Sequence, residues 1–229
     1  MFIRIATFLV LFSVTALISA CTTTDPARFD GEIDRPLVMP DTSVQMPKIV
    51  AFGDSLTAGF GLSETESYPY LLQEKLRADG YKYEVQNAGV SGDTSLGGLE
   101  RIDWVLGQDG VEILILELGA NDLLRNMPVD RMKQNLAGII KKAQAKNVKV
   151  LLCGMMAPPS MGADYERDYR NAFPDLADEY KTAYLPFVLD GVALKKELNQ
   201  ADGIHPNAEG TKIMTDNIYN ELKPLLTKQ

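Results

Sequence analysis

The chain has 229 residues, of which 45% are hydrophobic and 24% are charged, and this composition excludes a protein that is disordered over most of its length. Its formal net charge is -8 and it has no run of Lys or Arg, which argues against nucleic acid as a partner and against a basic patch that docks on anionic lipid. The length suits one α/β domain with an appendage.

Residues 1–20 have the pattern of an export signal. Arg4 supplies a positive charge near the start, and the stretch 5–18 is mostly apolar. This stretch is short for a membrane-spanning helix and is followed by small residues, which is typical of a cleaved signal peptide. We therefore expect an exported protein.

The junction Leu17-Ile18-Ser19-Ala20-Cys21 resembles a bacterial lipobox. The resemblance implies that Cys21 is lipidated and becomes the first mature residue, with the membrane as a partner. Thr22 at the next position resembles lipoproteins sent to the outer membrane, so we expect the periplasmic face of that membrane. The alternative is a soluble exported protein cleaved after Ala20.

Residues 21–47 are expected to form a flexible tether after the lipidated cysteine. Proline recurs in this segment, at Pro36, Pro40 and Pro47, and no helical or alternating pattern is present. The second cysteine, Cys153, then has no partner for a disulfide and lies in an apolar run, so we expect a buried, inert thiol.

From residue 48 to residue 229 strand and helix patterns alternate. This order implies a parallel sheet with right-handed crossovers. We predict a three-layer α/β/α fold whose five-stranded sheet has the flavodoxin-like order 2-1-3-4-5. The predicted strands are 48–52, 82–87, 113–118, 148–153 and 183–187, and the predicted helices are 68–78, 96–106, 129–145, 165–181 and 206–226.

A tight turn with the sequence Gly53-Asp54-Ser55 follows the first predicted strand. Gly53 allows a sharp bend, and Asp54 and Ser55 are residues that favour the start of a helix. The hydroxyl of Ser55 is thus expected at the carboxyl end of a strand, where α/β sheets bind their ligands. The alternative is that Ser55 only caps a helix.

The chain contains one histidine, His205, so any Ser-His catalysis depends on it. Asp202 lies three residues earlier, and Gly203 permits a bend in which the carboxylate reaches Nδ1 while Nε2 points outward. An acid has this orienting role in a catalytic triad. The alternative is a surface histidine beside the start of a helix.

Acyl transfer also requires donors where negative charge develops on the carbonyl oxygen. Gly92 follows the second predicted strand and can bring its N–H close to a ligand, and Asn121 follows the third and offers a neutral amide. Each turn has a simple structural alternative. All of these turns, however, are expected at the carboxyl edge of one sheet.

The stretches 53–56 (Gly-Asp-Ser-Leu), 91–94 (Ser-Gly-Asp-Thr), 119–122 (Gly-Ala-Asn-Asp) and 202–205 (Asp-Gly-Ile-His) resemble the four blocks of the SGNH (GDSL) hydrolases, in the family's order. They are most similar to the bacterial arylesterase, lysophospholipase and acyl-CoA thioesterase branch. The resemblance implies that Ser55 is the nucleophile, that Asp202 and His205 are its partners, and that the N–H groups of Ser55 and Gly92 form the oxyanion hole with Asn121.

We therefore expect a serine esterase that works through an acyl-enzyme on aryl esters and short-to-medium acyl esters, with lysophospholipids and thioesters as further candidates. No cofactor is needed, and one histidine with scattered carboxylates provides no spacing for a metal site. Three Leu- and Met-rich stretches are expected to rim the cleft and to favour apolar substrates: 60–62, 123–127 and 155–161.

Two alternatives are a carbohydrate O-deacetylase on the same scaffold and a lipoprotein that binds without catalysis. A preference for acetyl groups on sugars would identify the deacetylase. Failure to react with a fluorophosphonate would identify the binding protein. No pattern in the sequence indicates an oligomeric state.

Overall fold

The computed structural model describes residues 46–228. The export signal, the lipidated Cys21 and most of the tether predicted from the sequence lie outside the described residues. None of the helices within the described part combines the length and the apolar composition needed to cross a membrane.

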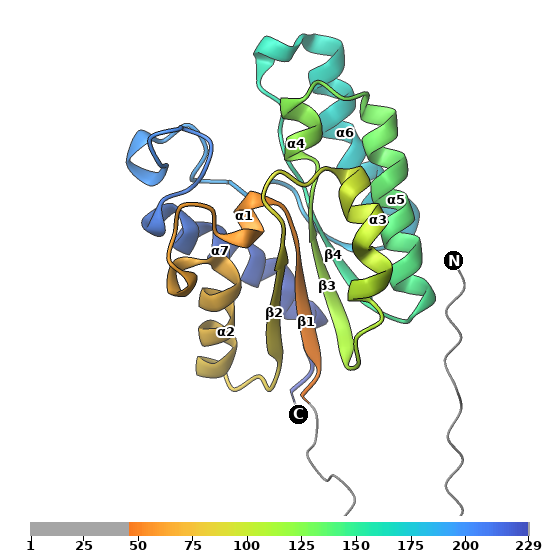
Figure 1. The fold of residues 1–229 in the computed structure, drawn as a ribbon, viewed down its shortest axis with the longest axis vertical. Helices are drawn as coiled ribbons and strands as arrows, with labels where there is room; N and C mark the ends of the chain where they lie inside the picture. Colours follow the sequence, from red (N-terminus) through yellow and green to blue (C-terminus); the bar gives the residue numbers. More distant parts are fainter. Residues whose placement is uncertain (1–45, 229) are drawn as a thin grey trace, which may run out of the picture. The chain divides into compact units, whose positions relative to one another are not determined.

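The centre of the fold is a five-stranded sheet in which every pair of neighbouring strands is parallel. Figure 1 shows neighbouring strands running side by side through the middle of the domain. The order β2-β1-β3-β4-β5 confirms the predicted order. The strands are β1 (Lys48–Gly53), β2 (Glu84–Gly89), β3 (Val111–Glu117), β4 (Lys149–Cys153) and β5 (Ala183–Leu185).

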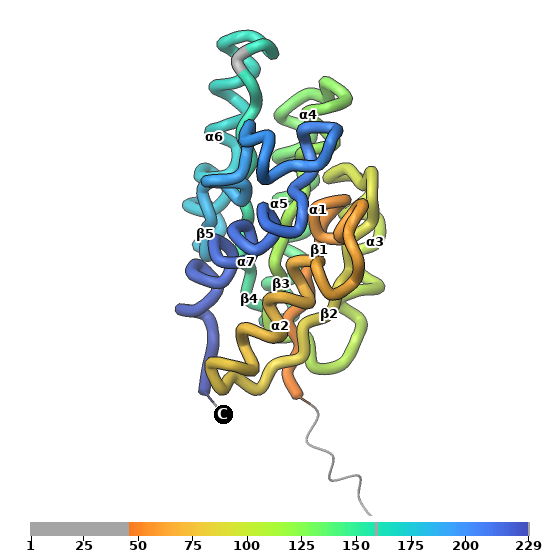
Figure 2. The backbone as a smooth tube through the Cα atoms, turned by 90° about the vertical axis from the view of Figure 1, so that its left-hand side faces the viewer, coloured from red at the N-terminus to blue at the C-terminus, as the bar shows by residue number. Residues whose placement is uncertain are grey.

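Helices cover both faces of the sheet, which confirms the three-layer architecture. On one face are α2 (Tyr68–Ala78) and α7 (Ala208–Leu222), which lie in front of the strands in Figure 2. On the other face are α3 (Ser95–Val105), α5 (Val129–Ala145) and α6 (Ala163–Tyr180). The helices pack through apolar stripes, so the central strands are buried on both sides as their continuous apolar runs predict.

Most predicted boundaries lie within two residues of the observed ones, and two differences have a clear cause. The last helix begins at Ala208 rather than at 206 because the Asn207 side chain caps it and accepts the N–H groups of Glu209 and Gly210. The short helix α4 (Ala120–Leu124) was not predicted, since five residues are too few to show a helical period.

The turns that carry the candidate residues all lie at the carboxyl edge of the sheet, which is the upper end of the strands in Figure 1. The four-residue helix α1 (Ser55–Ala58) begins there after β1, and α4 begins there after β3. Because β2 and β3 flank β1, the loops after these three strands are neighbours in space.

The buried core predicts a large difference between two leucines. Leu114 in β3 is fully buried, whereas Leu194 is 97% exposed. Leu114→Ala should lower the free energy of unfolding by about 2–5 kcal/mol because it leaves a cavity. Leu194→Ala should change it by less than about 0.5 kcal/mol. Urea unfolding measures both, and equal effects would contradict the burial seen here.

Candidate active site

Close packing at the end of β1 positions Ser55. Gly53 has no room for a side chain, since a Cβ atom there would come within 2.5 Å of the Glu117 carbonyl oxygen in β3 and closer still to the Thr57 hydroxyl. Asp54 caps α1 by accepting the N–H of Leu56 at 3.1 Å. Ser55 is therefore the first residue of α1, with its side chain facing a cleft.

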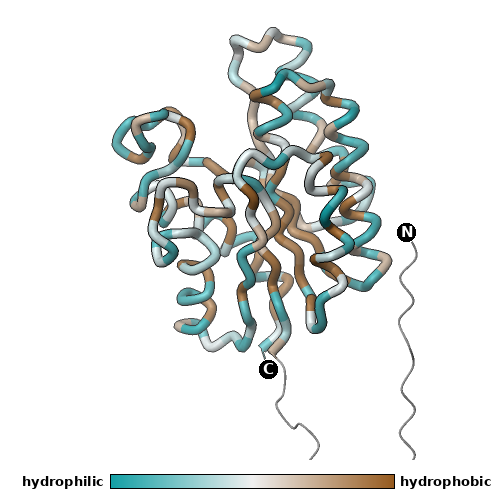
Figure 3. Tube along the Cα trace, in the orientation of Figure 1, coloured by the Kyte–Doolittle hydropathy of each residue, from teal (hydrophilic) through white to brown (hydrophobic). Residues whose placement is uncertain are grey.

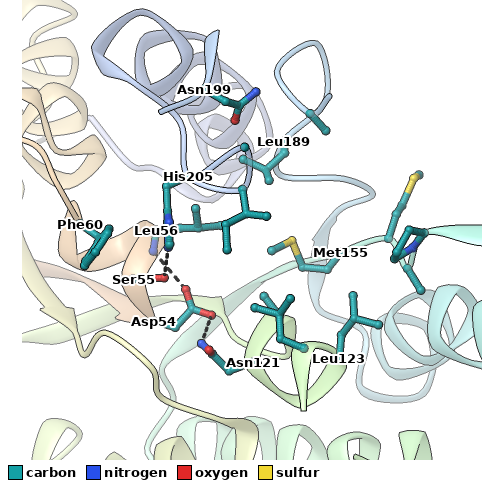
Figure 4. Close-up of a pocket in the computed structure, with 18 of the residues that line it drawn as sticks. Asp54, Ser55, Leu56, Phe60, Asn121, Leu123, Met155, Leu189, Asn199 and His205 are labelled. Carbon is teal, nitrogen blue, oxygen red and sulfur yellow. Dashed lines mark hydrogen bonds between the residues drawn. The ribbon is translucent and has the colours of Figure 1, made fainter. Parts of the chain in front are cut away.

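The structure brings together the three side chains of the predicted triad. The hydroxyl oxygen of Ser55 lies 2.8 Å from Nε2 of His205, although the two residues are 150 positions apart (Figure 4). Nδ1 of His205 lies 2.7 Å from Oδ2 of Asp202. A hydroxyl bonded to an imidazole that is in turn oriented by a carboxylate is the arrangement that activates a nucleophile.

Asp202 is held in its charged form. Its Oδ1 accepts the backbone N–H groups of Ile204 and His205. The hydrogen bond from the His205 side chain is the main cause that lowers the pKa of Asp202 to about 2. The two backbone hydrogen bonds lower it further. A carboxylate in this position favours the His205 tautomer that carries its proton on Nδ1 and leaves Nε2 free to accept one.

Two contacts that the sequence analysis did not predict hold the His205 turn. The ring of Phe60 lies 4.7 Å from the imidazole, measured between ring centroids. Gln200 donates from its side chain to the carbonyl oxygens of Phe60 and Pro206 and from its backbone to that of His205. A polar residue just before the Asp-Gly-Ile-His stretch was the available signal, but its partners could not be read from the sequence.

The predicted oxyanion donors face the same cleft as Ser55. The Asn121 amide donates one hydrogen to Oδ2 of Asp54 at 3.0 Å, which orients the amide and leaves its second hydrogen available. Gly92 has a φ of +83°, a conformation that favours glycine. Among residues 46–228, neither the Gly92 N–H nor the Ser55 N–H has a hydrogen-bond acceptor, so both remain available to a ligand.

Arg101, on α3, ties the turns around the site together and was missed by the sequence analysis. Its guanidinium donates to the carbonyl oxygens of Gly53 and Ala88, at the ends of β1 and β2, and to the Asp93 carboxylate at 2.7 Å. It also lies over the Phe52 ring, 3.9 Å from the centroid. Arg101 thereby fixes the Gly92 turn relative to Ser55, and no local pattern in the sequence marks it for this role.

A pair of buried acids lies beneath the nucleophile. Asp54 and Glu117 are both fully buried, and Glu117 accepts the Thr57 hydroxyl at 2.8 Å. Burial is the main reason that the pKa of Asp54 is raised to about 6. Burial also raises the pKa of Glu117 well above its usual value. With a pKa of about 6, Asp54 is mostly ionised at neutral pH, while burial favours the protonated form of Glu117.

The cleft beside Ser55 has a volume of about 620 Å³ and mostly apolar walls. Members of all three predicted rim stretches line it, but Gly61, Leu62 and the ends of the other two stretches do not. The sequence analysis missed the segment after β5, although the rule that loops follow the carboxyl ends of strands applies there too. The lining apolar residues are Leu56, Phe60, Ala120, Leu123, Leu124, Met155, Met156, Ala157, Pro158, Phe187, Leu189, Ala193, Leu194 and Ile204.

Within the described part of the chain, no three His, Cys, Asp or Glu side chains are placed so that they could hold a metal ion. Cys153, the described cysteine, is fully buried in β4, and burial raises the pKa of its thiol well above the usual value. It takes no part in the cleft.

The buried Asp54 predicts a pH-dependent stability. The folded chain keeps its proton up to about pH 6, whereas an unfolded chain releases it near the ordinary value of 3.8, so stability falls as pH rises through this interval. Asp54→Asn should remove this loss, which amounts to up to about 3 kcal/mol for a pKa raised from 3.8 to about 6.

The free energies of unfolding of wild type and Asp54→Asn are measured in urea at pH 4 and at pH 7. The difference between the two proteins should change between these pH values. Asp103→Asn replaces a carboxylate whose side chain is 68% exposed and serves as the control. A difference between wild type and Asp54→Asn that stays constant from pH 4 to pH 7 would contradict the raised pKa.

Comparisons with known proteins place these features in a family. The model of the GDSL-like lipase/acylhydrolase family matches residues 51–213. The chain is 39% identical over 190 residues to esterase TesA of Pseudomonas aeruginosa, covering 83% of this chain and 94% of that protein. It is 35% identical over 178 residues to thioesterase 1/protease 1/lysophospholipase L1 of Escherichia coli, covering 78% of this chain and 84% of that protein.

A crystal structure of TesA superposes with a TM-score of 0.76 at 40% identity, covering 78% of this chain and 99% of that one. The fold, the order of the four sequence blocks and these similarities agree. The chain belongs to the GDSL-like lipase/acylhydrolase family and is a serine hydrolase of carboxylic esters.

Proposed function

We propose that Ser55 is the nucleophile of this ester hydrolase, with His205 as general base and Asp202 as the acid that orients it. The observation that carries the assignment is the chain of hydrogen bonds from Ser55 Oγ through both nitrogens of His205 to Asp202, placed at an apolar cleft. The lone histidine has no other nucleophile within hydrogen-bonding distance among the described residues.

In this mechanism Nε2 of His205 takes the proton of Ser55 while Oγ attacks the acyl carbonyl carbon. The N–H groups of Ser55 and Gly92 and the Asn121 amide stabilise the oxyanion of the tetrahedral intermediate. His205 then protonates the leaving oxygen, and the acyl group stays on Ser55. A water molecule, deprotonated by His205, attacks the acyl-enzyme. His205 then returns the proton to Ser55 Oγ as the bond from Oγ to the acyl carbon breaks and the acid leaves.

The preferred substrates in this proposal are neutral esters with an apolar acyl chain or an aryl leaving group. The walls of the cleft are formed by Leu, Met, Phe and Ala side chains, which bind hydrocarbon and offer few partners to sugar hydroxyls. This contrast disfavours the carbohydrate O-deacetylase. Lysophospholipids and thioesters are further candidates, in keeping with the name of the E. coli relative.

A panel of p-nitrophenyl esters from acetate to decanoate tests this preference. Each methylene that enters the cleft should raise kcat/KM about fourfold, from about 0.8 kcal/mol per buried CH₂. The Ser55→Ala variant is the control, and it should lose both turnover and labelling by a fluorophosphonate while keeping its fold. Strict preference for acetate and for acetylated xylan would overturn the proposal in favour of the deacetylase.

The Asn121 amide should act on the transition state rather than on substrate binding. Asn121→Ala should lower kcat by roughly 10² to 10³, the usual cost of one oxyanion donor, with little change in KM. Steady-state kinetics on a single p-nitrophenyl ester separate the two parameters. A change confined to KM would instead assign Asn121 to substrate binding.

We further propose that the protein is an exported lipoprotein held at the periplasmic face of the outer membrane through Cys21. The lipobox-like junction Leu17–Cys21 and the residue Thr22 support this proposal. An apolar ester cleft on an anchored domain would act on esters at or near a lipid surface, away from cytoplasmic acyl-CoA.

Cys21→Ser removes the thiol that would carry the lipid. Metabolic labelling with a palmitate analogue should mark the wild-type protein and leave the variant unlabelled, whereas Cys153→Ser, the matched control, should be labelled like wild type. Equal labelling of wild type and Cys21→Ser would remove the lipoprotein proposal without affecting the esterase assignment.

A further inference from the structure

Exposed apolar side chains gather around the mouth of the cleft. The described residues include eleven large hydrophobic side chains that are exposed. Five of these line the cleft. Of two more, one is the neighbour of Ser91, which lines the cleft, and the other lies three residues after Leu124. We call these seven the rim: Phe60, Val90, Leu124, Met127, Met156, Leu194 and Ile204.

The rim is built by loops that converge from distant parts of the chain. Its members follow β1, β2, β3, β4 and β5 or precede α7, so all lie at the carboxyl edge of the sheet. The Arg125 guanidinium joins two of the loops by donating to the Gly92 carbonyl oxygen at 2.8 Å. In Figure 3 the brown hydrophobic colour fills the central strands and also recurs in loops at this edge.

Leu194 is the most exposed member of the rim. Its side chain is 97% exposed, and its φ of +65° is a conformation that few residues with side chains adopt. Burial within the domain therefore does not explain a leucine at this position. Contiguous exposed apolar surface that continues into a binding cleft is typical of a site that meets a partner or a membrane.

The charge around the rim differs from that of the whole chain. The chain has 31 acidic and 23 basic residues. The loops 59–62, 90–94, 123–127, 155–161 and 187–205 contain three basic residues, Arg125, Lys195 and Lys196, and four acidic ones, Asp93, Asp190, Glu197 and Asp202. The Asp93 carboxylate is paired with Arg101 of α3, and the remaining charges of the rim loops balance, which suits a surface of zwitterionic lipid better than an anionic one.

The two lysines that follow Leu194 also suit a lipid surface. Long basic side chains can extend from an apolar contact to the level of the headgroups while their stems stay in contact with hydrocarbon. Lys195 and Lys196 are exposed, and neither forms an ion pair with another described residue. They are therefore free to adopt such a position.

The length of chain outside the structure permits this orientation. The described part begins at Met46, just before β1, and therefore at the edge of the sheet opposite the rim. If Cys21 is the anchor, residues 21–45 can span up to about 85 Å when extended. The six residues of β1 span only about 20 Å, so the tether is long enough for either edge to face the membrane.

From these observations we infer that the rim docks on a surface of zwitterionic lipid and presents the cleft to esters held in that surface. The inference rests on the proposed ester hydrolysis, because it gives the cleft substrates that enter from a lipid phase. Docking and catalysis are nevertheless separate events that can be measured independently.

The single tryptophan of the chain makes a direct test available. Trp104 is 74% exposed near the end of α3, which runs back from the carboxyl edge toward the opposite one. In the double variant L194W/W104F, the single tryptophan lies instead at the rim. The full-length chains are mixed with phosphatidylcholine vesicles whose acyl chains are brominated or unbrominated, and tryptophan emission is compared.

The emission of L194W/W104F should be quenched by roughly half or more in brominated vesicles, because an interfacial side chain lies about 5–10 Å into the boundary between headgroups and acyl chains. Wild-type Trp104 should be quenched little, even if Cys21 anchors the chain. Both proteins can carry Ser55→Ala, so loss of quenching and loss of hydrolysis are distinguishable failures.

Two rim residues outside the cleft provide the second variant. V90D/M127D, added to L194W/W104F, should abolish the quenching. In the otherwise wild-type chain it should lower hydrolysis of vesicle-borne lysophosphatidylcholine at least tenfold while leaving hydrolysis of soluble p-nitrophenyl acetate unchanged. A thermal unfolding midpoint of V90D/M127D equal to that of the wild type would exclude misfolding as the cause of the lower hydrolysis.

Equal quenching of both tryptophans, or none at the rim, would overturn the inference. Sedimentation of the same proteins without lipid gives a further decisive outcome. A dimer that V90D/M127D dissociates, together with no quenching at the rim, would assign the rim to a second copy of this chain instead of to lipid.

Discussion

The turn between β1 and α1 is the constraint on which the site depends. Gly53 is pressed against the β3 backbone, so the chain must leave the sheet at this point with Asp54 turned inward and Ser55 facing the cleft. The Asp54 carboxylate accepts the N–H of Leu56 and the amide of Asn121. One buried side chain therefore orients both the helix that begins at the nucleophile and a candidate donor to the oxyanion.

This arrangement has an electrostatic cost. Asp54 and Glu117 are both removed from water, and burial raises both pKa values. One oxygen of Glu117, Oε1, is buried without a partner among residues 46–228. Such groups destabilise a folded protein unless another role retains them. In this chain they lie directly beneath Ser55, where the carboxylate of Asp54 can only accept and so keeps the Asn121 amide turned the right way.

The two parts of the site differ in how they are held. The polar groups are fixed by hydrogen bonds, such as those that Arg101 donates to the ends of β1 and β2 and to Asp93, and the one that the His205 backbone N–H donates to Asp202. The apolar walls come from loops and contain several Met and Leu side chains, which adapt to ligands of different shape. A fixed reaction centre beside an adaptable wall is consistent with one chemistry on a range of apolar esters.

By itself the sequence determined the order of strands and helices, the parallel sheet and the identity of the candidate triad. These features rest on local patterns, namely apolar runs, glycine turns and a single histidine, together with the resemblance of four short blocks to the SGNH hydrolases. The boundaries of α2 and α5 agree with the prediction because their apolar spacing is regular over eleven and seventeen residues.

Only the tertiary structure decided how the turns meet. The bond between Asp54 and Asn121 joins residues 67 positions apart, and Arg101 reaches Gly53 across 48. Glu117 lies in an apolar strand, and its pattern does not indicate the contact with Thr57. Gln200 donates to the carbonyl oxygen of Phe60, which is 140 positions away. Such contacts have no period or spacing in the sequence, because they arise when separate elements pack against one sheet and bring its turns to a common edge.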